Sequence, residues 1–464
     1  MKQKITFLLK CTLVILPFIA ISLYTKFNLI KFVDSELPYF IWNKDFCQTS
    51  HESPYNVLIL GDSTSNAAYM PEVLSDSCVN LALGGTNPMD SYYIMKDWLK
   101  NNQAPKTVYI SFADTHFSTA DWFWTRTMFT HRFSIQDNLE MLKMATVYQE
   151  DSIISENDII DFISYQLYLP NKYITALSNG GFNQRYETNL TLYAEDSLHN
   201  GHYMARGNKE WQPTEVSYEH FSVSPLFNLY YQKLIEMCLE NHIQVHLIKL
   251  PLPSSTVFTS EYENELASYY DNLTAKYPKV TFDWIRTYED QNFADPSHMN
   301  THGSLKFSTQ IKELYPDDFD SVYSDHRIEA LNDNIRDENR IEEMFKWAAS
   351  GPYTLLIYDP SGDFEQKFDK IFQTGNLVSH SLDIGLSEGN NLYFVADSSI
   401  DTFPSLSPNI SHQTLEGQTS EMDYKWELDS VQNITFLIID NFHNSVVCTK
   451  EFHLTQNPYV LVDN

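Results

Sequence analysis

Short apolar runs alternate with longer amphipathic segments through the first two thirds of the chain. The apolar runs have the length and near-continuous hydrophobicity of parallel strands that are buried on both faces. They lie at 56–60, 78–83, 107–112, 243–249 and 279–282. Helical patterns in the later part lie at 225–241, 260–275 and 302–314. This alternation predicts an α/β fold in which a doubly wound parallel sheet lies between two layers of helices.

The N-terminus carries the most apolar stretch of the chain. Residues 5–24 are interrupted only by Lys10 and are long enough to cross a bilayer, and two lysines precede them. We therefore expect residues 1–26 to form a transmembrane signal anchor that places the rest of the chain outside the cytoplasm. A cleaved signal peptide ending near residues 20–22 is the alternative. Residues 27–54 would form a tether.

The predicted α/β domain covers residues 55–322 and carries a long insertion at about 118–224. The insertion has a helical pattern at about 134–168 and an irregular, polar and aromatic part at about 178–222. Insertions of this size at the carboxyl edge of a sheet usually shape the substrate site.

The last part of the chain has a different pattern. A charged, helical connector is expected at 323–350, and residues 351–464 contain strand-like runs with few helices. This pattern predicts a β-rich, sandwich-like accessory domain. It would bind a partner or a glycan, or would only stabilise the protein.

The charge and the cysteine content of the chain narrow the range of functions that it can have. The chain has 464 residues and a formal net charge of −30, so it offers no basic face for nucleic acid. None of the five cysteines forms a Cys-x-x-Cys pair, which argues against structural zinc, and no cofactor is expected. Cys47 and Cys78 precede the first two predicted strands and form a disulfide only if the strands bring them together.

A serine stands where the first predicted strand ends. Residues 56–60 run into Gly61-Asp62-Ser63-Thr64, after which a helix can begin. Ligands of α/β proteins bind at the carboxyl edge of the sheet, so the Ser63 hydroxyl is a candidate nucleophile. The alternative is that Ser63 only caps the helix.

A candidate base for this serine lies far downstream. Asp295 stands three residues before His298, so one loop could supply both a general base and the carboxylate that orients it. Alternatively, Asp295 caps the following helix. A further alternative is that His298 and His302 share a helix face and hold a metal with Asp295, but a third rigid ligand is not evident and no metal is expected.

These motifs together resemble the SGNH/GDSL hydrolase superfamily. They are Gly-Asp-Ser after the first strand, a glycine turn after the second, and Asp-x-x-His near the domain's end, and they span roughly residues 55–320. The resemblance implies a three-layer, flavodoxin-like fold. It also implies a catalytic triad in which His298, oriented by Asp295, takes the proton of Ser63.

The resemblance further implies an oxyanion hole. The backbone N–H of Ser63 would supply one donor. Gly85 would supply a second, because it lies five residues after Asn80, the spacing of the family's second motif. The alternative is that Gly85 serves only its turn.

The third donor of the family departs from the pattern. Many members have an asparagine in a Gly-x-Asn-Asp stretch, which here reads Ser111-Phe-Ala-Asp114. Asp114 takes the place of the asparagine, and an ionised aspartate can only accept hydrogen bonds. The hole is therefore reduced, or Thr115 or His116 substitutes.

The chain is most similar to the membrane-anchored, exported branch of DltD-like and alginate O-acetylation proteins. This likeness implies a bacterial cell-surface or periplasmic O-acyltransferase, in the first place an O-acetyltransferase, that acts on a polysaccharide beside a membrane-bound O-acyltransferase. Trp122, Trp124 and Arg126 would form a sugar-stacking wall with a cation, or a hydrophobic lid. The alternatives to transfer are a carbohydrate esterase with the same triad and a non-catalytic scaffold.

Overall fold

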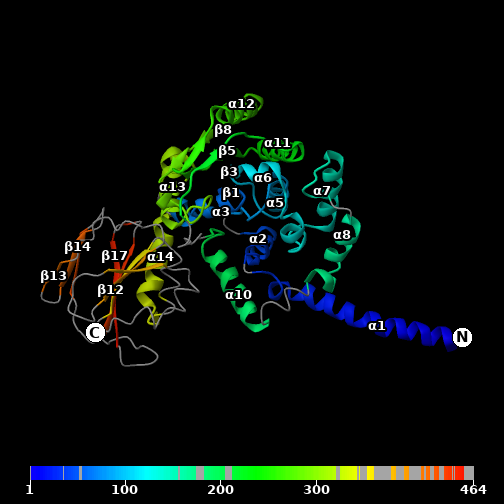
Figure 1. The fold of residues 1–464 in the computed structure, drawn as a ribbon, viewed down its shortest axis with the longest axis horizontal. Helices are drawn as coiled ribbons and strands as arrows, with labels where there is room; N and C mark the ends of the chain where they lie inside the picture. The colour runs from blue at the N-terminus through cyan, green and yellow to red at the C-terminus, as the bar shows by residue number, and fades with distance from the viewer. Residues whose placement is uncertain are drawn as a thin grey trace.

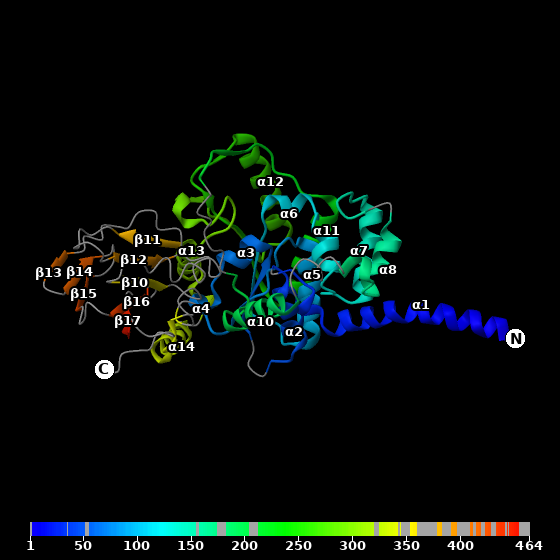
Figure 2. The same cartoon turned by 60° about the horizontal axis from the view of Figure 1, so that its bottom comes forward.

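The protein is described here from a computed structural model. The structure describes residues 2–34, 36–51, 55–154, 157–173, 182–203, 212–319, 324–341, 344, 353–359, 378–382, 391–396, 409–411, 414–418, 423–427, 433–440, 443 and 445–453. An α/β body occupies the middle of the molecule, with the N-terminal helix projecting from one end and the β-rich part at the other (Figures 1 and 2).

The body is built on a five-stranded sheet whose paired strands all run parallel, in the order β2-β1-β3-β5-β8. These strands are β1 (Val57–Gly61), β2 (Cys78–Asn80), β3 (Thr107–Ser111), β5 (Gln244–Lys249) and β8 (Val280–Trp284). Every residue of β1 and β3 is buried, as expected of strands covered on both faces. The predicted parallel sheet is confirmed.

Alternate residues of the central strands enter different cores. Leu58 and Leu60 join the larger core, which includes residues of α2 (Pro38–Gln48), α5 (Pro88–Asn101), α11 (Pro225–Glu240) and α12 (Ser260–Lys276). Val57 and Ile59 join the core that includes residues of α3 (Ser63–Ala68), α4 (Pro71–Leu74) and α13 (Thr301–Leu314). Since side chains alternate between the faces of a strand, the sheet is the middle of three layers.

The strand order creates a crevice at one edge of the sheet. The chain passes from β1 to β2 on one side and then returns to β3 on the other side of β1. The carboxyl ends of β1 and β3 therefore meet at the topological switch point, where open α/β sheets bind ligands. The segments that follow these two strands carry Ser63 and His116.

The insertion is more helical than expected. It follows α6 (Asp114–Ser118) and contains a π-helix η2 (Phe123–Met128), α7 (Ile135–Tyr148) and α8 (Asp158–Gln166). The part expected to be irregular contains α10 (Phe182–Leu198). Asn189 of α10 is buried and donates to the carbonyls of Ile30 and Val33, so tertiary contacts stabilise a helix that its polar sequence alone does not predict.

The predicted tether also differs. Residues 38–48 form α2, whose Phe40 and Trp42 are buried in the larger core. Cys47 is buried there as well, and Cys47 and Cys78 are free thiols, so the disulfide that the sequence left open is not formed.

The expected transmembrane helix is corrected. Residues 2–27 form α1 (Lys2–Phe27), but no helix within the described part of the chain is long and apolar enough to cross a membrane. The charged Lys10 lies inside α1 and interrupts its apolar run.

Within its described residues, the C-terminal part has two antiparallel sheets. The larger one has the order β11-β12-β10-β16-β17 and the smaller one β13-β14-β15. Their strands are β10 (Tyr353–Asp359), β11 (Val378–Leu382), β12 (Asn391–Ala396), β13 (Asn409–Ser411), β14 (Thr414–Gln418), β15 (Asp423–Glu427), β16 (Asn433–Asp440) and β17 (Ser445–His453).

The expected connector contains α14 (Ser324–Asp337), while residues 342–343 and 345–350 lie outside the described residues. Asn332 of α14 donates to Asp440 (2.9 Å) and accepts from the hydroxyl of Tyr353 (2.8 Å), which fixes α14 to the larger C-terminal sheet. The short elements are η1 (Leu29–Lys31), β4 (Val216–Tyr218), β6 (Leu252–Pro253), β7 (Thr256–Phe258), β9 (Thr287–Tyr288), η3 (Asp290–Asn292) and η4 (Pro316–Asp318).

Candidate active site

The turn from β1 into α3 places Ser63 at the sheet edge. Gly61 ends β1 with φ +150°, and a Cβ there would lie 2.0 Å from the carbonyl oxygen of Ser111, so only glycine fits. Asp62 caps α3, because its Oδ1 accepts from the N–H and the hydroxyl of Thr64 at 2.8 and 2.6 Å. Ser63 is thus the first residue of α3 and not its cap, and its side chain stays available.

Ser63, His298 and Asp295 form a continuous hydrogen-bonded relay. Nε2 of His298 lies 2.8 Å from Oγ of Ser63, and Nδ1 of His298 lies 2.7 Å from Oδ2 of Asp295. With the proton on Nδ1 held by the carboxylate, Nε2 is free to accept the serine proton. This is the geometry of an activated serine nucleophile.

The loop of Asp295 holds the carboxylate in place. Its Oδ1 accepts from the N–H groups of Ser297 and His298 at 2.8 and 2.9 Å. Burial alone would raise the pKa of Asp295, but the hydrogen bond and charge of His298 and these N–H donors lower it to about 2. The carboxylate is therefore ionised at neutral pH and keeps His298 in the tautomer that a general base needs.

The loop that carries His298 is fixed to α3, the helix that begins with Ser63, through α13. Asn300 caps α13 by accepting from the N–H of Gly303 at 3.0 Å, so Asp295 is not the cap. Ser304 and Ser308 of α13 donate to the carbonyls of Ala67 and Ala68 in α3 at 2.6 and 3.2 Å. These bonds hold the two halves of the relay in register.

The metal alternative loses its basis. His298 precedes α13, whereas His302 is its second residue, so the two do not share a helix face. Within the described residues, only His220, Glu261 and Glu265 come close enough together to hold a metal ion, and none of them belongs to the relay.

The turn after β2 lies beside the end of β1. Thr86 donates from its hydroxyl to the carbonyl of Gly61 at 3.0 Å, which anchors the turn. Gly85 adopts φ +72°, and a Cβ there would lie 2.9 Å from Cδ1 of Trp122. Asn80 is buried and donates to three carbonyls of α3 and its C-terminal end, those of Ser65, Asn66 and Tyr69. The glycine turn thus lies at the edge of the sheet that carries Ser63.

Asp114 is turned away from this edge. Its carboxylate forms an ion pair with the buried ammonium of Lys249 and accepts from the hydroxyl of Tyr262 at 2.7 Å. Both carboxylate oxygens are therefore used between β5 and α12. Asp114 stabilises the fold and does not take the position of the third oxyanion donor.

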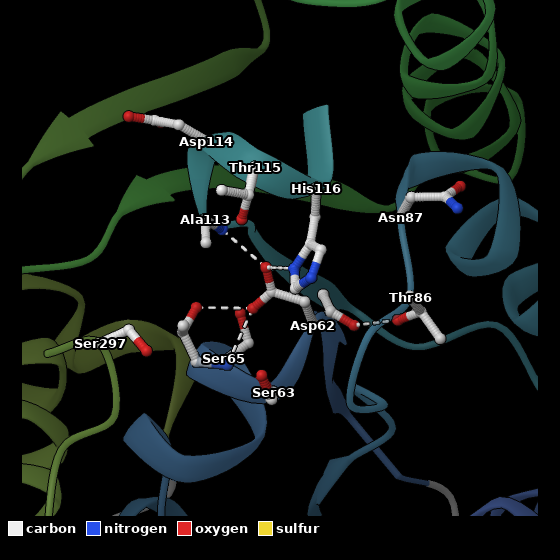
Figure 3. A network of polar contacts seen from close by, with 12 residues as sticks. Asp62, Ser63, Ser65, Thr86, Asn87, Ala113, Asp114, Thr115, His116 and Ser297 are labelled. Carbon is white, nitrogen blue, oxygen red and sulfur yellow. Dashed lines mark hydrogen bonds and ion pairs between the residues drawn. The ribbon is translucent and has the colours of Figure 1, made fainter. Parts of the chain in front are cut away.

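His116, two residues later in α6, faces Asp62 instead (Figure 3). Nδ1 of His116 lies 2.6 Å from Oδ2 of Asp62, and this oxygen also accepts from the N–H of Ala113 at 2.7 Å. Burial would raise the pKa of Asp62, but the charge and hydrogen bond of His116 lower it to about 2. The sequence pointed to His116 only as a substitute for Asp114; its partnership with Asp62 was not expected.

The three residues of the proposed sugar-stacking wall have different environments. The indole of Trp122 is 47% exposed, and the guanidinium of Arg126 lies 4.7 Å from its ring centre. Arg126 also pairs with Glu36 at 2.9 Å. In contrast, Trp124 stacks on Tyr165 and donates from Nε1 to a backbone carbonyl at 2.8 Å. Trp122 and Arg126 therefore lie beside the Gly85 turn, while Trp124 belongs to the packing of the insertion.

Comparison with protein-family models finds none that matches this chain, and no curated protein matches it. The assignment of chemistry therefore depends on the motifs and on the geometry of the relay.

Proposed function

We propose that the protein transfers an O-acyl group, most simply acetyl, through an ester formed at Ser63. The relay from Asp295 through His298 to Ser63 is the single observation that carries this proposal. In the first step, Oγ of Ser63 attacks the donor carbonyl while His298 takes its proton. His298 then returns that proton to the leaving oxygen.

In the second step, an acceptor hydroxyl loses its proton to His298 and attacks the ester of Ser63. Ser63 recovers the proton as the new ester leaves.

We propose a saccharide as the acceptor because an exposed indole, that of Trp122, and a guanidinium, that of Arg126, lie beside the Gly85 turn. Aromatic faces stack on sugar rings, and a cation attracts an anionic glycan. A membrane-bound O-acyltransferase as the partner that supplies the acyl group stays a prediction.

An esterase is the second candidate because the relay is open to water. The side chains of Asp295 and His298 are 40% and 23% exposed. Water could therefore replace the sugar hydroxyl in the second step, and transfer needs an acceptor that outcompetes it.

One experiment separates these functions. Purified protein is incubated with an acetyl ester donor, with and without oligosaccharides, and free acetate and sugar mass are followed. Acetylated sugar that requires Ser63 supports transfer, whereas acetate release that no sugar changes supports the esterase. A serine-directed fluorophosphonate probe that fails to label the folded protein would favour a scaffold without catalysis. Trp122→Ala should raise the KM for the saccharide about tenfold if its indole stacks on the sugar.

A further inference from the structure

A second Asp–His pair borders the nucleophile. Asp62 directly precedes Ser63 in the chain, and its Oδ2 lies 2.6 Å from Nδ1 of His116. The carboxylate of Asp62 is fully buried, and the side chain of His116 is 16% exposed. The pair is therefore anchored inside the protein at Asp62 but reaches solvent at His116.

The second ring nitrogen of His116 is available to a ligand. Nδ1 is used by Asp62, and within the described residues no hydrogen bond engages Nε2. In Figure 3 the ring lies above Asp62, and its second nitrogen is turned away from that carboxylate, on the side where Thr86 and Asn87 lie. Thr86 and Asn87 directly follow Gly85 in the turn after β2.

The surrounding charges favour a protonated ring. Burial alone would lower the pKa of His116, but the charge and hydrogen bond of Asp62 raise it above its ordinary value. Asp90 of α5 also raises this pKa, while Arg126 of η2 opposes it. Burial raises the pKa of Asp90 itself to about 6, so its carboxyl gains a full charge only above that pH. These interactions favour the imidazolium form of His116, in which Nε2 carries a proton.

We propose that Nε2–H of His116 is the third donor of the oxyanion hole, alongside the N–H groups of Ser63 and Gly85. This inference rests on the proposed function. Asp114 cannot fill that role because its carboxylate is bound to Lys249 and Tyr262. A cationic donor fixed by Asp62 stabilises the negative oxygen of the tetrahedral intermediate without having to reorient.

His298 and His116 have different roles in the reaction: His298 transfers a proton, and His116 keeps its own. As Oγ of Ser63 bonds to the acyl carbon, its proton moves to His298 and the carbonyl π electrons move onto the oxygen. His116 keeps its proton and only donates a hydrogen bond to that oxygen. When the intermediate collapses, the leaving oxygen takes the proton from His298. If His116 loses its own proton at high pH, Nε2 becomes an acceptor and the third donor is lost.

The test compares wild type with His116→Ala and His116→Asn, using p-nitrophenyl acetate at pH 5–10. We expect His116→Ala to lower kcat about 10²- to 10³-fold with little change in KM. His116→Asn keeps a neutral donor, so it should recover part of kcat and lose the decline at alkaline pH that wild type shows. His220→Ala is the matched control, since His220 is an exposed histidine that also lies beside carboxylates.

The outcomes that overturn the inference are distinct. Wild-type kcat in folded His116→Ala would exclude a donor role. If kcat fell equally in His116→Ala and His116→Asn, and both variants still showed the wild-type decline at alkaline pH, His116 would only support Asp62. Thermal unfolding of each variant identifies loss of fold, and the pH profile of His116→Asn then decides. If a fluorophosphonate does not label Ser63 in wild type, the proposed function fails and the inference fails with it. Normal labelling with an unaffected His116→Ala overturns the inference alone.

Discussion

Nε2 of His298 lies 2.8 Å from Oγ of Ser63, although the two residues are 235 positions apart in the chain. The contact depends on the seam between α3 and α13, where Ser304 donates to the carbonyl of Ala67 at 2.6 Å. The nucleophile and its base are thus held by two helices on the same face of the sheet, which gives the relay a rigid frame.

Replacing the nucleophile tests the relay directly. Ser63→Ala should lower the rate of ester turnover about 10⁴-fold or more and abolish fluorophosphonate labelling, because no other group takes the acyl chain. Ser260→Ala is the matched control: Ser260 is exposed and is also the first residue of a helix, α12. Labelling that survives in Ser63→Ala would assign the chemistry to another serine.

Asp295→Asn tests the orientation of His298. The asparagine oxygen can still accept from the N–H groups of Ser297 and His298, so the loop should persist. Its amide would donate to Nδ1 and leave the proton on Nε2, where it blocks transfer from Ser63. We expect kcat to fall about 10⁴-fold. Steady-state kinetics with thermal unfolding as the control would check this, and a loss below tenfold would contradict the role of Asp295.

Asp114→Asn should destabilise the protein. Lys249 is only 4% exposed, and the substitution removes the charge that compensates its buried ammonium. Breaking a buried ion pair in this way costs about 3–5 kcal/mol of unfolding free energy. Urea unfolding measures this free energy. The control Asp121→Asn replaces an exposed aspartate and should change the unfolding free energy by less than about 0.5 kcal/mol. A stable and more active Asp114→Asn variant would show that Asp114 faces the oxyanion hole.

The pair of Asp62 and His116 predicts a pH dependence of stability. The pKa of Asp62 falls from 3.8 to about 2 on folding, so its contribution is present above pH 3.8 and is lost as the pH falls toward 2. The pKa of His116 is raised from 6.5, so its contribution is present below pH 6.5 and is lost as the pH rises through the folded value. By linkage, the Asp62 shift corresponds to about 2 kcal/mol of unfolding free energy.

Urea unfolding of wild type and Asp62→Asn across pH 3–9 measures this window. The difference between the two proteins should be largest near pH 5 and should shrink toward both ends. A difference that does not change with pH would mean that Asp62 stabilises the fold only by capping α3.

Gly85→Ala tests the glycine turn. The positive φ and the 2.9 Å approach of Trp122 to a Cβ at this position should lower the unfolding free energy by about 1–2 kcal/mol. A displaced Gly85 N–H should also lower kcat at least about tenfold. Adding Trp122→Ala removes the steric conflict but not the backbone strain, so the double variant should recover part of the stability. Unchanged kcat in Gly85→Ala would exclude Gly85 from the oxyanion hole.

The sequence predicted the parts of the fold whose signals are local. Apolar runs bounded by turns marked the strands of the parallel sheet, because strands covered on both faces have few polar residues. The α10 helix and the buried α2 were not predicted. Asn189 donates hydrogen bonds to backbone carbonyls more than 150 positions away in the chain. Trp42 is buried in the larger core of the α/β body. Such contacts leave no periodic pattern in a short window.

By itself, the sequence determined which residues could carry the chemistry: a serine after the first strand and an aspartate three residues before a histidine. Their residue types and spacing are enough, because one loop can hold an Asp–His pair. Only the tertiary structure decided which partners the side chains of Asp114 and His116 bind. Asp114 binds Lys249 from β5, and His116 binds Asp62 from the turn after β1. These partners are distant in the chain, and the pairing of β3 with β1 on one side and with β5 on the other brings them within ion-pair distance of His116 and Asp114.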